Sequence, residues 1–112
     1  MNWYDARDVC INELNGDLAS MANAEENAMA AAILPYPTPW SYVWIGSRDN
    51  ISEGSWYWVD GTPMTWTNHD DSNARDSSDC GEFHTNNLSL GNWDDNDCGT
   101  TNQAFLCKIR HD

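Results

Sequence analysis

The segment Trp93–Cys98 reads WDDNDC and places three carboxylates and one amide between a tryptophan and a cysteine. Carboxylates this close repel one another unless a cation lies among them. Oxygen atoms of Asp, Glu and Asn side chains are suitable ligands for a hard cation. The segment therefore indicates a bound cation or, alternatively, a basic partner.

More acidic side chains precede this segment, in a polar stretch without hydrophobic periodicity. Thr67–Ser78 lacks the apolar residues of a core element and lies between Trp66 and Cys80. A structureless loop of this length in a compact domain is usually functional or disordered. The acids of the region are Asp70, Asp71, Asp76, Asp79, Glu82, Asp94, Asp95 and Asp97. A solvated acidic surface is one interpretation; the flanking anchors favour a loop that binds a cation.

The length of the chain indicates a single domain, and its charge argues against nucleic acid as a partner. The chain has 112 residues, with 18 Asp and Glu against 5 Lys and Arg, and a formal net charge of −13. One domain over 1–112 is expected, with a small core rich in tryptophan. Nucleic acid is not an expected partner, because phosphate binding needs positive charge. No apolar stretch is long enough to cross a membrane.

Four cysteines, Cys10, Cys80, Cys98 and Cys107, form an even set without a CxxC pair. This spacing favours two disulfides over a zinc site, and the cysteines alone leave three pairings open. A bridge from Cys10 to Cys107 would close a long loop and stabilise the fold by about 4 to 5 kcal/mol. Disulfides indicate an oxidising compartment, so we expect a secreted or extracellular chain, or the ectodomain of a larger cell-surface protein.

Two helices are predicted in the first third of the chain. An apolar stripe at spacings of three and four predicts a helix over 2–14, capped by Asn2 and ended by Asn15-Gly16. Its inward residues are expected to be Trp3, Ala6, Cys10 and Leu14. A second helix is expected from Asn23, with Glu26 completing a capping box. Its expected inward residues are Ala28, Met29, Ala32 and Ile33, and Pro35, Pro37 and Pro39 follow it.

The pattern then changes to short strands. Strands are predicted at 42–45 and 56–59, the second closed by the turn Asp60-Gly61, and near 80–84 and 104–109. The WDDNDC segment is expected to be a loop between the last two strands. The tryptophans at 44, 56, 58 and 93 are expected in the core, while His69, Arg75 and His84 are expected at the surface rather than in contact with a ligand. The fold class is therefore α+β.

The sequence resembles the C-type lectin-like domain of the C-type lectin family over nearly its whole length. The residues that carry the resemblance are Trp3-x-x-Ala6-x-x-x-Cys10, Gly16-Asp17-Leu18-Ala19, Glu26-Asn27, Trp44-Ile45-Gly46, Glu53-Gly54-x-Trp56-x-Trp58, Asp60-Gly61, Trp66, Cys80, Trp93, Cys98 and Phe105-x-Cys107. The resemblance implies two helices packed on short antiparallel sheets, a long calcium-binding loop over about 61–79, and disulfides Cys10–Cys107 and Cys80–Cys98. The family's first strand, upstream of Trp3, is expected to be missing.

The resemblance also implies two calcium sites. The structural site maps onto Asp49, Glu53, Asn73 and Asp79. The sugar-coordinating site maps onto Asp70, Asp71 and Ser72, then Ser78, then Trp93, Asp94 and Asp95, of which Asp70, Ser72, Asp94 and Asp95 are the expected metal ligands. Asp70, Ser72, Ser78, Asp94 and Asp95 are the residues expected to contact a sugar. The sequence departs from the family here, because the middle proline is absent, two serines replace longer ligands, and Asp94 stands where an amide is usual.

The function that the resemblance implies is calcium-dependent carbohydrate binding, in which sugar hydroxyls coordinate calcium and hydrogen-bond to its ligands. The missing proline and the serines leave an alternative open: a calcium-stabilised recognition domain for a protein, lipid, ice or mineral surface. The family rule that separates mannose from galactose binders does not apply to Asp-Asp-Ser. An enzyme is not expected, because the chain shows no catalytic triad pattern. Oligomerisation would raise avidity for a glycan.

Overall fold

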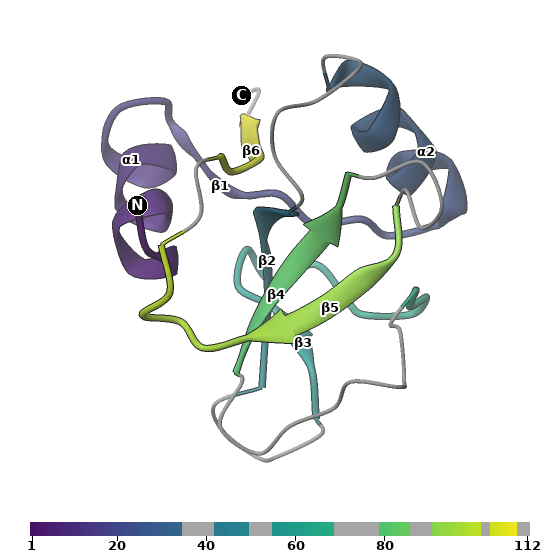
Figure 1. The fold of residues 1–112 in the computed structure, drawn as a ribbon. Helices are drawn as coiled ribbons and strands as arrows, with labels where there is room; N and C mark the ends of the chain where they lie inside the picture. Colours follow the sequence, from purple (N-terminus) through teal and green to yellow (C-terminus); the bar gives the residue numbers. More distant parts are fainter. Residues whose placement is uncertain (35–41, 50–54, 69–78, 86–90, 102–103, 110–112) are drawn as a thin grey trace.

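A computed structural model describes residues 1–34, 42–49, 55–68, 79–85, 91–101 and 104–109 (Figure 1). The elements are α1 (Trp3–Asn12), β1 (Gly16–Leu18), α2 (Ala24–Ile33), β2 (Tyr42–Arg48), β3 (Tyr57–Trp58), β4 (Cys80–His84), β5 (Trp93–Asn96) and β6 (Cys107–Ile109). β1 pairs with β6, and the larger sheet has the order β3-β2-β4-β5 with antiparallel neighbours throughout. The predicted α+β class, with two helices beside short antiparallel sheets, is confirmed.

The boundaries of α1 follow from local residues. Asn2 caps the helix, because its side chain accepts a hydrogen bond from the backbone N–H of Asp5. Asn15 adopts a positive φ of 56° after the helix, a conformation that asparagine tolerates better than most residues. Trp3, Ala6 and Cys10 are buried as predicted, but Leu14 is exposed. The helix ends at Asn12, so its apolar stripe does not extend to position 14.

The start of α2 is also as predicted. The side chain of Asn23 accepts from the backbone N–H of Glu26, and a Glu26 carboxylate oxygen accepts from the backbone N–H of Ala22. These bonds satisfy donors that a helix start leaves unpaired.

The inward face predicted for α2 is wrong. Ala28 and Ala32 are exposed, and the side chains of Met29 and Ile33 are 67% and 71% exposed. The buried residue is Asn27, whose amide bonds to Gly91 and Trp93. These bonds to distant segments set the rotation of the helix, because they pair the buried amide of Asn27, which is costly to leave without partners.

Strands form near all four predicted positions, with three differences. WDDN is strand β5 rather than a loop, and β1 was not predicted. The last predicted strand shortens to β6, while Phe105 forms an isolated parallel bridge with Trp44. β5 forms because it pairs with β4 residue by residue, from Phe83 opposite Trp93 to Cys80 opposite Asn96. Pairing with a neighbouring strand thus overrides the low strand propensity of Asp and Asn.

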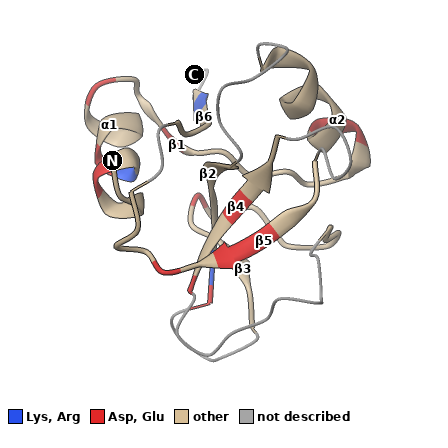
Figure 2. Ribbon diagram, in the orientation of Figure 1, with Lys and Arg blue, Asp and Glu red and all other residues tan. Residues whose placement is uncertain are grey.

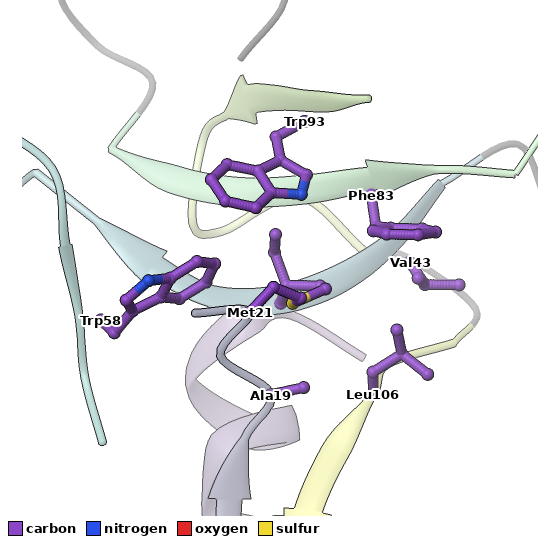
Figure 3. Close-up of a cluster of buried hydrophobic side chains, with 8 residues drawn as sticks. Ala19, Met21, Val43, Trp58, Phe83, Trp93 and Leu106 are labelled. Carbon is purple, nitrogen blue, oxygen red and sulfur yellow. The ribbon is translucent and has the colours of Figure 1, made fainter. Parts of the chain in front are cut away.

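Two clusters of buried side chains hold these elements together. The first core cluster, drawn in Figure 3, contains Ala19, Met21, Val43, Ile45, Trp58, Phe83, Trp93 and Leu106. The second contains Trp3, Ala6, Cys10, Leu18, Trp44, Cys80 and Cys98. The core positions predicted for Trp44, Trp58 and Trp93 are confirmed, whereas Trp56 is only partly buried.

The two disulfides pair as the family resemblance implied. Cys10 is bonded to Cys107, which joins α1 to β6, and Cys80 is bonded to Cys98, which joins the start of β4 to the residues after β5.

A polar network joins α2, β6 and the turn after β3. Lys108 Nζ donates to Ser20 Oγ and Glu26 Oε1, and Ser20 Oγ donates to Asp60. The backbone N–H of Ala22 lowers the pKa of Glu26, with a smaller contribution from Lys108 and against the effect of burial. Burial raises the pKa of Asp60, but hydrogen bonds, led by that from Ser20, outweigh burial and leave it lowered. Both acids are therefore held in their charged form beside Lys108.

Close packing on the larger sheet requires glycine at position 81. A Cβ atom at Gly81 would lie 1.7 Å from the Oγ of Ser47, which is fully buried. Gly81→Ala should lower the free energy of unfolding by about 1 to 3 kcal/mol, the usual cost of overpacking a core. Urea denaturation measures this. Adding Ser47→Ala should restore most of the loss, because Ser47 Oγ has no hydrogen-bond partner in the described part of the chain. Equal losses in the single and double variants would contradict this account.

Candidate functional site

The predicted calcium ligands that the structure describes lie around the ends of β2 and β4 and on β5. Asp49 follows β2, Asp79 precedes β4, and Asp94 and Asp95 are within β5. Figure 2 shows the acidic positions of β4 and β5 on neighbouring strands. Five predicted site residues lie outside the described residues: the calcium ligands Glu53, Asp70, Ser72 and Asn73, and the sugar contact Ser78.

Asp49 and Asp79 are brought together by the pairing of β2 with β4. Arg48 is opposite Cys80, and the backbone N–H of Asp49 donates to the carbonyl of Asp79 at 3.1 Å. Asp49 is 3% exposed, and a buried carboxylate oxygen of Asp79 has no hydrogen-bond partner among the residues described. A buried carboxylate oxygen without a donor is costly unless a cation meets it. These two side chains therefore have the chemistry that calcium needs.

Asp94 and Asp95 are both buried, at 7% and 6% exposed. Side chains alternate along a strand, so Asp95 lies on the face of Gly81 and Asp94 on the face of Glu82, their respective partners on β4. One oxygen of Asp94 accepts from the backbone N–H of Asp95, and the other lies 3.6 Å from His84 Nε2. Asp94 and Asp95 are therefore not part of a solvated acidic surface, which was one interpretation of the acid-rich sequence.

Sequence reasoning missed two buried residues beside this pair. Glu82 is 2% exposed and accepts a hydrogen bond from the Asn96 side chain at 2.7 Å. The surface position predicted for His84 is wrong, since it is 6% exposed and its ring packs edge-on against Tyr42. Alternation along the strand gave no signal for their burial, because all five residues of β4 are buried. His69 and Arg75 lie outside the described residues.

The described residues supply only part of a metal site. Within them, no three acidic, histidine or cysteine side chains are arranged to hold a metal ion. Calcium takes about six to eight oxygen ligands, so the four described aspartates need the ligands predicted at the other four positions. Neither of the described helices is long and apolar enough to cross a membrane.

The chain is similar to known proteins along nearly its whole length. The family profile described as "Lectin C-type domain" matches residues 1–109. C-type lectin domain family 4 member M from Nomascus concolor is 32% identical over 113 residues, which cover 96% of this chain and 26% of that protein. This chain thus spans about a quarter of the length of that relative.

Two of the solved structures that share the fold are named for different activities. One is the cow C-type carbohydrate-recognition domain of CD23 in the presence of a GlcNAc2Man3 oligosaccharide, with a TM-score of 0.82, 27% identity, and coverage of 99% of this chain and 82% of that one. The other is a calcium-independent type II antifreeze protein, with a TM-score of 0.81, 29% identity, and coverage of 96% and 77%. One fold therefore occurs in a carbohydrate-recognition domain and in a protein named for a different activity.

Proposed function

The chain belongs to the C-type lectin domain family, and on this premise we propose that it is a calcium-dependent carbohydrate-binding module. Members of the family are binding proteins and not enzymes. The observation that carries the proposal is the burial of Asp94 and Asp95 on β5, directly after the core residue Trp93. A strand that is held in place by its pairing with β4 suits a site that must hold two carboxylates in fixed positions.

The residues divide into two groups by proposed role. Asp49 and Asp79, with Glu53 and Asn73, hold a structural calcium that orders the loop, and Asp70, Ser72, Asp94 and Asp95 hold the second ion. The second calcium would supply coordination positions for two neighbouring sugar hydroxyls. Carboxylates accept hydrogen bonds from those hydroxyls, and such charge-assisted bonds orient a sugar. Asp94 accepts only, unlike an amide, so we expect ligands that present hydroxyl donors at this position. Ser78 is the remaining proposed contact.

A second candidate function is recognition of a non-sugar ligand, such as a protein, a lipid, ice or a mineral surface. The likeness to the calcium-independent type II antifreeze protein supports it, as do the missing proline and the two serines at positions 72 and 78. In this case calcium only stabilises the loop. Under either function we propose a secreted or extracellular setting, which the two disulfides support.

Immobilised monosaccharides separate the two functions. The chain is applied to mannose, galactose, fucose and N-acetylglucosamine resins in calcium and eluted with EDTA, and a glycan array follows. Retention on a sugar that EDTA abolishes supports the carbohydrate-binding module. A melting temperature that falls in EDTA, in a chain that no resin or array spot retains, supports the second function. A chain that EDTA affects in neither assay rules out both forms of the proposal.

A further inference from the structure

Two asparagines outside the predicted ligand set converge on the residues that lead into β5. Asn27 on α2 donates from Nδ2 to the carbonyl of Gly91 at 2.9 Å, and its Oδ1 accepts from the indole N–H of Trp93 at 2.8 Å. Asn68 donates from Nδ2 to the same Gly91 carbonyl at 2.7 Å, and its backbone carbonyl accepts from the backbone N–H of Trp93 at 2.9 Å. Together they use both acceptor positions of one carbonyl and both N–H groups of Trp93.

This arrangement, the asparagine clamp, is closely packed; it is buried at Asn27 and Trp93 and partly buried at Asn68. Asn27 is 8% exposed and Trp93 is fully buried. Gly91 has a φ of +87°, and a Cβ there would lie 3.0 Å from Asn27 Nδ2, so the backbone conformation and the packing both favour glycine. Leaving a buried polar group unbonded costs about 1 to 3 kcal/mol. The clamp therefore fixes the position of Trp93 relative to α2.

The position of the clamp relates it to the predicted ligands. Trp93 immediately precedes Asp94 and Asp95, so its backbone sets where β5 places both carboxylates. Asn68 bonds to the same residue of β5 and lies two positions before the proposed ligand Asp70 in the sequence. Groups that orient the ligands of a metal, without touching the metal, commonly change its affinity when removed.

We propose that Asn27 and Asn68 are positioning residues that hold Asp94 and Asp95 in the arrangement that binds calcium. The inference rests on the proposed function, because it assigns the clamp to that site. If it holds, Asn27 makes the calcium affinity depend on α2, although α2 carries none of the predicted ligands.

The test measures calcium affinity by calorimetry in the full chain carrying Asn27→Ala, Asn68→Ala or the control Asn23→Ala. Each clamp variant should raise the calcium Kd about tenfold, at the lower end of the effects seen when groups around a metal site are removed. Asn23→Ala makes the same change on α2 but removes only the helix cap. It should lower the melting temperature in EDTA and leave the calcium Kd unchanged. Asn68→Ala keeps the backbone bond to Trp93, so it is the variant expected to fold if Asn27→Ala does not.

The outcomes separate the inference from the proposed function. Clamp variants that melt earlier in EDTA but bind calcium as tightly as Asn23→Ala would show a purely structural clamp and overturn the inference alone. A wild-type chain that takes up no calcium would overturn both.

Discussion

Asp95→Ala should remove most calcium binding at the proposed sugar site and, with it, retention on sugar. Asp95 is 6% exposed on β5, so its carboxylate is held by the strand and a neighbouring side chain has little freedom to replace it. The number of charged ligands sets calcium affinity over several orders of magnitude among known sites, and we expect the Kd of this ion to rise at least about tenfold. Calorimetric titration with calcium measures the effect.

Asp97→Ala is the matched control for this change. Asp97 lies two residues further along the chain and is exposed, and its side chain accepts a hydrogen bond from the nearby backbone N–H of Gly99. The control loses the same charge and the same side-chain atoms but no proposed ligand. Titration curves that coincide for the two variants would show that Asp95 is not a ligand. Loss of one bound ion in Asp95→Ala, with the second retained, would support two separate sites.

Local sequence signals predicted the parts of the fold that depend on neighbouring residues. The cap at Asn2, the cap at Asn23 and the turn at Gly61 each involve residues a few positions apart, so their chemistry is visible in the sequence. The inward face of α2 was not predictable in this way. It is set by Asn27, whose partners Gly91 and Trp93 are far along the chain.

The site shows the same limit. Residue type alone indicated that Asp94 and Asp95 are ligands, but the acid-rich composition suggested a loop, and the pairing of β5 with β4 makes it a strand. That pairing buries Glu82 and His84 beside Asp94, which no local pattern of charges indicates. Strand pairing between distant segments is a property of the whole fold, so its consequences for burial appear only in the structure.

Removal of the Cys10–Cys107 bridge should produce the largest loss of stability. The bridge joins residues 97 positions apart, and the other bridge joins residues 18 positions apart. In the loop-entropy model these closures are worth about 4 to 5 and about 3 kcal/mol. The variant with alanine at 10 and 107 should therefore unfold at a much lower urea concentration than the variant with alanine at 80 and 98. The total free energy of unfolding of a small domain is about 5 to 15 kcal/mol. Loss of this bridge would remove much of it, so the denaturation is best measured at low temperature, where the variant is most stable.

Calcium affinity should rank the same two variants in the opposite order. Cys80 directly follows Asp79, and Cys98 closes the segment that contains Asp94 and Asp95. Loss of this bridge frees the ends of β4 and β5 relative to each other, so the calcium Kd should rise even where the chain stays folded. The bridge from Cys10 joins α1 to β6, which carry no predicted ligand, so a folded chain without it should keep the wild-type Kd. If the less stable variant also binds calcium more weakly, global stability rather than local geometry controls the site.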